Sequence, residues 1–267
     1  TSNKAQVDRL LSVGERVDGS SLLPYVDAAS SDLYVIPRYK TAYVNPFSPV
    51  LTVDILCSYY TSDGVRLPNS PENIVRRANE ALKESTGLTL EAMGELEYYV
   101  FYAKQHFYPA REKGGYHESL PFAKWEGLRC EAMRAIAQAG GEIKYGHAEV
   151  GNIHGEDYDI EQHEIEFLPV PVEDAADQII IARWMLRMIG YKYGLTISFA
   201  PKVLVGHAGS GLHIHTKLVK DGKNMMVEGG KLSDVAQKAI AGYLSLAPSL
   251  TAFGNTVPTS YLRLVPH

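Results

Sequence analysis

The sequence has 267 residues, of which 45% are hydrophobic and 21% are charged. A chain of this length and composition can bury a sizeable core, as one large domain or as two unequal ones. Its formal net charge of −5 and its pI near 6.0 argue against a surface that neutralises nucleic-acid phosphates or anionic lipids. We therefore expect small molecules or other copies of the chain as partners, and neither nucleic acid nor membrane.

Cysteine usage and hydropathy predict a reducing, cytoplasmic setting. Cys57 and Cys130 are the only cysteines, too few for a disulfide framework and without the spacing of a zinc site. We expect both to be buried apolar residues. Residues 1–21 lack the apolar core of a signal peptide, and the most apolar later run, residues 178–191, is interrupted by Arg183 and Arg187.

A change of pattern near residues 64–72 predicts a domain boundary. Before it, residues 33–37 and 50–60 are rich in β-branched and aromatic side chains, which predicts strands. After it, predicted helices and strands alternate. We therefore expect a smaller domain over residues 1–66 and a larger one over residues 67–267.

Four helices are predicted from apolar spacing and from residues typical of helix ends. Ser70 stands directly before Pro71 and Glu72, and Gly87 is placed to end that helix. The expected helices cover residues 71–86, 122–139, 173–193 and 234–246.

Three predicted strands, over residues 94–101, 161–170 and 210–218, carry polar side chains at every second position. Side chains two apart in a strand point to the same face. Each strand therefore presents one polar face. The side chains on these faces are Glu95 and Glu97, then Gln162, Glu164 and Glu166, then His213 and His215.

One such polar face usually meets water, but three in one chain indicate more than a half-exposed sheet. Carboxylates that converge repel one another and raise each other's pKa unless cations lie between them. A mixed set of glutamates and histidines, dominated by oxygen, suits magnesium or manganese better than zinc. The pattern therefore predicts a divalent-cation site.

Two further segments are compatible with phosphate chemistry. The loop GHAGSGLHIH at residues 206–215 has glycines that let backbone donors approach an anion, and Arg263 has a guanidinium that can clamp phosphoryl oxygens. By itself each feature is more often a plain turn or a surface residue. Leu262 and Leu264 flank Arg263, so we expect an extended backbone that buries both leucines and turns the guanidinium to the polar face.

The succession VDGSSL, SDLYVIP, GELEYYVF, EVGN…EQHEIEF, PKVLVGHAGSGLHIHTKL and SYLRLVP resembles that of the glutamine synthetases over residues 17–266. The resemblance implies an α+β fold, in which the antiparallel sheet of the catalytic domain curves around the active site with helices outside. A partial β-grasp domain, with most of its N-terminal strands absent, would precede it. The longer spacing between Glu149 and Gln162 indicates a divergent branch.

The resemblance also implies roles for individual residues. Glu97, Glu149 and Glu164 would bind one Mg²⁺ or Mn²⁺. Glu149 and Glu164 would also contribute to substrate binding. Glu95 and His213 would bind a second metal, which bridges the phosphates of the co-substrate ATP.

The remaining roles concern substrates. His215 would lie near the nucleotide phosphates, and Arg263 would contact both the nucleotide and the transferred phosphoryl group. Gly209 would approach the amino acid through its backbone. Asp18 and Ser21 would be lent to the ammonium site of a neighbouring subunit in a homo-oligomeric ring, where Asp18 binds ammonium and accepts its proton. A lone chain would then keep both residues away from its own Glu97.

The implied activity is that of a glutamate–ammonia ligase in glutamine biosynthesis and nitrogen metabolism, which proceeds through γ-glutamyl phosphate. A ligase acting on a polyamine or alkylamine stays open because Ala208 stands where the family usually has Asn, and because residues 150–161 form a long segment. A non-catalytic assembly or regulatory module also stays open. It is favoured because the family's glutamate flap, later arginines and last ligand of the second metal have no counterpart before His267. On that ground we expect a fragment of a longer protein, with little activity alone.

Overall fold

The computed structural model describes residues 3–264 and divides the chain into two compact units, residues 1–85 and residues 86–267. Val265 and Pro266, the last two residues of the SYLRLVP motif, lie outside the described residues.

The first unit combines short helices with small antiparallel sheets. After α1 (Lys4–Val13), strands β1 (Glu15–Asp18), β2 (Asp32–Pro37) and β5 (Cys57–Thr61) form a three-stranded sheet in the order β1-β2-β5. Strands β3 (Tyr43–Val44) and β4 (Val53–Asp54) form a separate pair, and α2 (Gly19–Leu22) is a single turn after β1. The predicted strand at 33–37 is confirmed, whereas residues 50–60 divide between β4 and β5.

Helix α3 (Pro71–Thr86) confirms the first predicted helix, including its end at Gly87, where φ is +72°. The buried Ser70 stands directly before this helix, and its carbonyl accepts from the backbone N–H of Ile74 at 3.0 Å. Its hydroxyl donates to the carboxylate of Glu72 at 2.7 Å.

The second unit is built on an antiparallel sheet in the order β12-β11-β6-β8-β7. Its long strands are β6 (Thr89–Ala103), β7 (Ile143–His154), β8 (Tyr158–Phe167) and β11 (Leu212–Lys220), with β12 (Lys223–Asn224) at one edge. Strands β9 (Val170–Pro171) and β10 (Thr196–Ser198) also pair with β6, and β13 (Val227–Glu228) pairs with β14 (Lys231–Leu232). The three polar strands of the sequence lie in β6, β8 and β11, next to one another.

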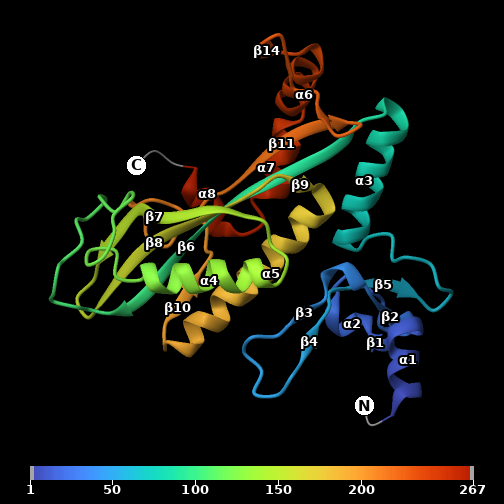
Figure 1. The fold of residues 1–267 in the computed structure, drawn as a ribbon, viewed down its shortest axis with the longest axis horizontal. Helices are drawn as coiled ribbons and strands as arrows, with labels where there is room; N and C mark the ends of the chain where they lie inside the picture. Colours follow the sequence, from blue (N-terminus) through green and yellow to red (C-terminus); the bar gives the residue numbers. More distant parts are fainter. Residues whose placement is uncertain (1–2, 265–267) are drawn as a thin grey trace. The chain divides into compact units, whose positions relative to one another are not determined.

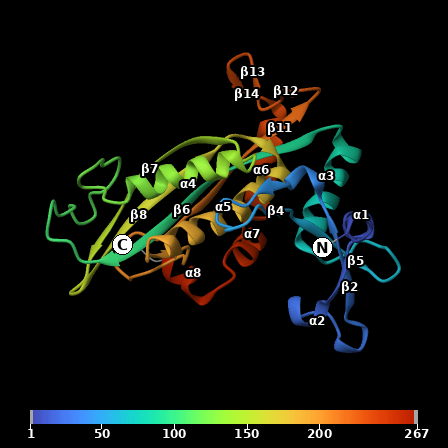
Figure 2. The same cartoon turned by 60° about the horizontal axis from the view of Figure 1, so that its bottom comes forward.

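Helices α4 (Glu126–Gln138) and α5 (Val172–Lys192) run along one side of this sheet (Figure 1, Figure 2). Leu96 and Tyr98 from β6 and Ile165 from β8 are fully buried toward this side, where they meet the apolar stripes of the helices. The strand positions between them carry Glu95, Glu97 and Glu164. Alternation along each strand therefore directs the apolar side chains to the helices and the carboxylates to the opposite face.

The remaining predicted helices are confirmed with small changes of boundary. Helix α6 (Asp234–Ser245) is capped by the Ser233 hydroxyl, which accepts from the backbone N–H of Ala236 at 3.1 Å. Helices α7 (Ala247–Gly254) and α8 (Pro258–Arg263) follow. Within residues 3–264, no helix is long and apolar enough to cross a membrane.

The expectation that both cysteines are buried is wrong for Cys130, which is exposed, while Cys57 is half-buried. The buried positions of α4 are Leu128, Arg129, Ala132, Ala135 and Ile136. Cys130 lies off that stripe, so its side chain turns away from the sheet.

A buried glutamine joins three segments of the second unit. Gln162 on β8 is fully buried, and its Nε2 donates to Glu97 Oε2 on β6 at 2.8 Å and to the carbonyl of Gly209 at 3.0 Å. Its Oε1 accepts from the backbone N–H of Gly151 on β7 at 3.0 Å. One side chain thus fixes a carboxylate, the glycine loop and the neighbouring strand relative to one another.

We predict that Gln162→Leu lowers the free energy of unfolding of the second unit by at least about 2 kcal/mol, because each buried polar group left unpaired costs about 1–3 kcal/mol. Urea unfolding followed by tryptophan fluorescence measures this, since both tryptophans, Trp125 and Trp184, belong to the second unit. The control is Gln138→Leu at the exposed end of α4, which should change stability by no more than about 0.5 kcal/mol. Equal losses in the two variants would contradict the joining role of Gln162.

Candidate active site

The register of the strands brings acidic side chains together on the open face of the sheet. Glu97 on β6 stands opposite Glu164 on β8, and His213 on β11 stands opposite Glu95 on β6. On the far side of β8, His147 of β7 stands opposite Glu164. Four neighbouring strands therefore contribute to one polar surface.

Two groups of side chains on this surface have the spacing of a metal shell. The ligand atoms of Glu95, Glu164 and His213 all lie within 4.8 Å of one another, and so do those of His147, Glu149 and Glu164. Four of the five predicted ligands thus fall into these groups, with Glu164 in both. The predicted set also placed Glu97 with Glu149 and Glu164, and Glu97 is in neither group.

Protein donors hold Glu97 from one side. Its Oε2 accepts from Gln162 Nε2 at 2.8 Å and from the backbone N–H of Gly211 at 2.9 Å. A Cβ atom at Gly211 would lie 2.7 Å from Oε1 of Glu97, so a side chain at this position would displace the carboxylate. The carboxylate is fixed through Oε2, which leaves Oε1 for another partner.

Burial and mutual repulsion shape the electrostatics of the surface. Burial raises the pKa of Glu97, although the hydrogen bond from Gly211 and the charge of His213 oppose that shift. Burial, followed by the charges of Glu97, Glu95 and the other nearby carboxylates, raises the pKa of Glu164 to about 8. A divalent cation would remove this repulsion, because its charge favours the ionised form of every carboxylate around it. The donor set therefore fits a divalent cation.

The two histidines of β11 both contact Glu95. His213 Nδ1 donates to Glu95 Oε2 at 3.0 Å, and His215 Nε2 donates to Glu95 Oε1 at 2.7 Å. Both imidazoles are more than half exposed, at 58% and 59%. The structure thus places His215 beside Glu95, on the same face as the candidate metal ligands.

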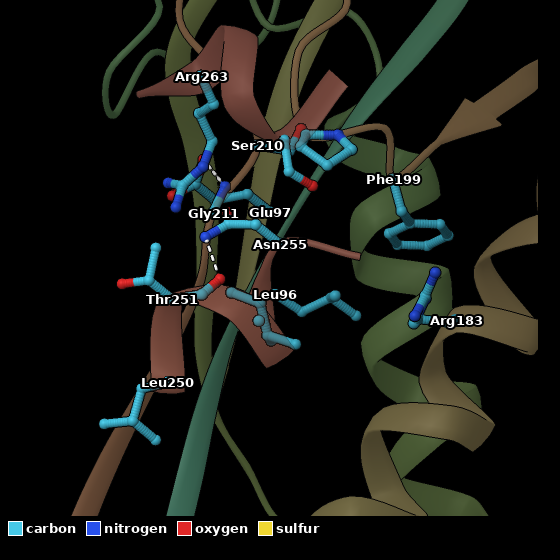
Figure 3. Close-up of a pocket in the computed structure, with 14 residues that line it drawn as sticks. Leu96, Glu97, Arg183, Phe199, Ser210, Gly211, Leu250, Thr251, Asn255 and Arg263 are labelled. Atoms are coloured by element: carbon cyan, nitrogen blue, oxygen red, sulfur yellow. Dashed lines mark hydrogen bonds between the residues drawn. The ribbon is translucent and has the colours of Figure 1, made fainter. Parts of the chain in front are cut away.

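The glycine loop and Arg263 meet beside this surface. A Cβ atom at Gly209 would lie 2.6 Å from the carbonyl oxygen of Pro201 and 2.6 Å from Cγ of Arg263, so only glycine fits there. Arg263 also lines a cavity of about 400 Å³ together with Glu97, Ser210 and Gly211. Figure 3 shows the Arg263 side chain extending toward Glu97 and Gly211.

The predicted conformation around Arg263 is wrong. Arg263 ends helix α8 and is not in an extended segment, and Leu262 and Leu264 are 44% and 52% exposed. Pro258 stands at the start of this helix, where its fixed φ favours helical geometry. The guanidinium reaches the cavity from the end of a helix, and no burial of the leucines is needed.

Asp18 and Ser21 form a compact turn in the first unit. Asp18 caps α2, and its carboxylate accepts from the hydroxyls of Ser20 at 2.7 Å and Ser21 at 2.6 Å. Hydrogen bonds from Ser21, and then from Ser20 and Ser31, lower the pKa of Asp18 to about 2. These donors preserve the negative charge of Asp18.

Sequence reasoning did not identify His147, nor the three hydrogen bonds of Gln162. His147 and Glu149 are two residues apart in a single strand, so the alternation that grouped Glu95 with Glu97 also applies to them. The bonds of Gln162 to Glu97 and Gly209 gave no such signal, because these two partners lie far away in the sequence.

Two domain families of the glutamine synthetases match this chain. The glutamine synthetase beta-grasp domain family matches residues 1–62, and the glutamine synthetase catalytic domain family matches residues 68–267. The glutamine synthetase of Clostridium saccharobutylicum is 30% identical over 269 residues, and that of Thermus thermophilus is 30% identical over 277 residues. Both alignments cover 98% of this chain, but only 59% and 60% of the relatives, so the chain spans about three fifths of their length.

Solved structures show the same fold. The glutamine synthetase of Plasmodium falciparum superposes with a TM-score of 0.85 at 22% identity, covering 94% of this chain and 54% of that one. The ADP complex of GmaS superposes with a TM-score of 0.81 at 19% identity, covering 98% of this chain and 60% of that one. The expected α+β fold, an antiparallel sheet with outer helices preceded by a β-grasp domain, is thereby confirmed. The chain belongs to the glutamine synthetase family.

Proposed function

We propose that this chain carries the metal- and phosphate-binding part of an ATP-dependent ligase that forms glutamine from glutamate and ammonia. The observation that supports this most is the carboxylate and histidine surface of β6, β8 and β11, which lies directly beside the glycine loop and Arg263. A metal surface alone would fit many reactions. A metal surface next to an anion-binding loop and a guanidinium fits phosphoryl transfer.

The reaction has two steps. An oxygen of the glutamate γ-carboxylate attacks the terminal phosphorus of ATP, and the bond from that phosphorus to the leaving ADP oxygen breaks. Ammonia then attacks the carbonyl carbon of γ-glutamyl phosphate, and phosphate leaves. Two Mg²⁺ or Mn²⁺ ions, held by Glu97, Glu149 and Glu164 and by Glu95 and His213, would neutralise the phosphate oxygens during transfer.

The remaining groups around the metals have positions that suit their proposed roles. Arg263 would hold the transferred phosphoryl group as negative charge spreads over its oxygens. His215, beside Glu95, would contact the nucleotide phosphates. At Gly209 the absence of a side chain lets the amino acid approach the backbone, and the Gly209 carbonyl is already held by Gln162.

Asp18 and Ser21 would serve the ammonium site of a neighbouring subunit in a ring. A carboxylate with a pKa of about 2 is fully ionised at neutral pH, so it attracts an ammonium ion well. We assign Asp18 the binding of ammonium, with its carboxylate as the acceptor of the proton that ammonium releases.

Ser21→Ala should raise the pKa of Asp18 toward its ordinary value of 3.8, because the hydrogen bond from Ser21 is the largest cause of the shift. Carbon-13 NMR of the labelled carboxyl measures this directly. The folded pKa is depressed, so the stabilisation is present above pH 4 and is lost as the pH falls through about 2. Ser85→Ala in the exposed part of α3 is the control and should leave the Asp18 titration unchanged. The same pKa in wild type and in Ser21→Ala would contradict the assignment.

A related ligase that acts on an alkylamine or polyamine is the second candidate. Ala208 offers no side-chain amide at the start of the glycine loop, although its carbonyl is held by the hydroxyl of Tyr99 at 2.7 Å. The long segment at residues 150–161 is a hairpin, formed by the end of β7 and the start of β8. Both differences concern substrate contacts and leave the metal surface intact, so the two candidates share the first chemical step.

Phosphate release decides between the candidates. The protein at its full natural length is incubated with ATP, glutamate, Mg²⁺ or Mn²⁺, and ammonia, methylamine or spermidine in turn. The proposal predicts metal-dependent release that is fastest with ammonia. Faster release with methylamine or spermidine would favour the second candidate, and no release with any amine would favour a non-catalytic assembly module.

Arg263→Lys should lower kcat by at least about tenfold while changing the affinity for ATP much less. A lysine keeps the charge but loses the fork that holds two phosphoryl oxygens, and that contact strengthens as charge spreads in the transition state. Steady-state kinetics of the full-length protein measures both quantities. Arg134→Lys on the exposed side of α4 is the control. Near-normal kcat in both Arg263→Lys and Arg263→Ala would make Arg263 a surface residue without a role in the reaction.

A further inference from the structure

His147 is a buried imidazole on the metal-facing side of β7. Its side chain is only 6% exposed, and its strand position lies opposite Glu164. The ring stacks on His117, with centroids 4.5 Å apart and planes 7° from parallel, and on Tyr145 at 5.4 Å. Tyr116 meets it edge-on at 5.3 Å. These aromatic neighbours fix the direction of the ring before any ligand arrives.

One hydrogen bond decides which nitrogen of His147 is free. Nδ1 lies 3.0 Å from the carbonyl oxygen of Ala148, and a carbonyl can only accept, so Nδ1 carries a proton. In the neutral ring Nε2 then presents a lone pair. Metal-binding histidines typically show this arrangement, in which one nitrogen donates to a backbone carbonyl and the other binds the ion.

The free nitrogen faces carboxylates. Nε2 lies 3.0 Å from Glu164 Oε2 and 3.8 Å from Glu166 Oε1. A nitrogen lone pair and a carboxylate oxygen at that distance need a proton or a cation between them. Glu149 brings a third donor, and the ligand atoms of His147, Glu149 and Glu164 lie within 4.8 Å of one another, close enough to share one ion.

We infer that His147 is a further protein ligand of the cation held by Glu149 and Glu164, and that it makes this position favour Mn²⁺ over Mg²⁺. Mg²⁺ takes oxygen ligands almost exclusively and keeps several waters, whereas first-row transition metals accept imidazole nitrogen. The inference rests on the proposed divalent-cation site. It adds a nitrogen ligand that neither the sequence motifs nor the family resemblance assigned.

Pulsed EPR of bound Mn²⁺ tests the inference directly, because an imidazole nitrogen that binds the ion couples to it much more strongly than one that only lies nearby. The measurement uses a protein carrying His213→Gln and His215→Gln, since both side chains are exposed and are the two imidazoles that contact Glu95. Nitrogen coupling should persist in this background and vanish when His147→Gln is added. Adding His106→Gln instead, at an exposed histidine on the same unit, should leave the coupling unchanged.

Titration calorimetry supplies the second readout. His147→Gln should weaken Mn²⁺ binding by at least about tenfold and Mg²⁺ binding by no more than about threefold. Mn²⁺ binding without nitrogen coupling in the doubly substituted background would overturn the inference and leave the metal site of the proposed function standing. No Mn²⁺ binding at all, in wild type as well, would overturn both. The background variant keeps His147 in place, so the EPR result does not depend on whether His147→Gln folds.

Discussion

The organisation of the second unit depends on a repulsion. Antiparallel pairing of β6 with β8 puts Glu97 opposite Glu164, β6 also carries Glu95, and β7 and β11 add Glu149 and His213 to the same face. Burial of this surface removes the water that would otherwise screen the charges, which is why the pKa of Glu164 rises to about 8. Proteins do not usually gather buried carboxylates without a compensating charge. The arrangement is therefore best understood as a surface prepared for divalent cations.

Several neighbouring features hold this surface in place. Gln162 and the backbone N–H of Gly211 fix one oxygen of Glu97, and Gly209 allows the loop to pack directly on Arg263. On the helix side, α4 and α5 bury the alternate residues of the same strands. The geometry of the acidic face thus depends on the apolar packing behind it, because a shift of one residue in register would exchange the two faces.

Much of this could be predicted from the sequence, because it follows from local rules. Alternation along β6, β8 and β11 identified Glu95, Glu97, Glu164 and His213 as neighbours, and Gly87 marked the end of a helix correctly. The two errors concern Arg263 and Cys130. The extended conformation predicted at Arg263 was wrong because Pro258 starts a helix there. The predicted burial of Cys130 was wrong because Cys130 does not belong to the apolar stripe of α4. Glu97 and Gly209, two hydrogen-bond partners of Gln162, each lie more than 45 positions from it in the chain, so no local sequence pattern reveals these bonds.

We propose that the face formed by β6, β7, β8 and β11 binds divalent cations. Anomalous diffraction from crystals of the protein soaked in Mn²⁺, collected near the manganese absorption edge, tests this. Anomalous density should appear between Glu95, Glu164 and His213 and between Glu149 and Glu164, within bonding distance of their oxygen and nitrogen atoms. Well-ordered crystals with no manganese density on this face, or with the carboxylates turned away from one another, would contradict it.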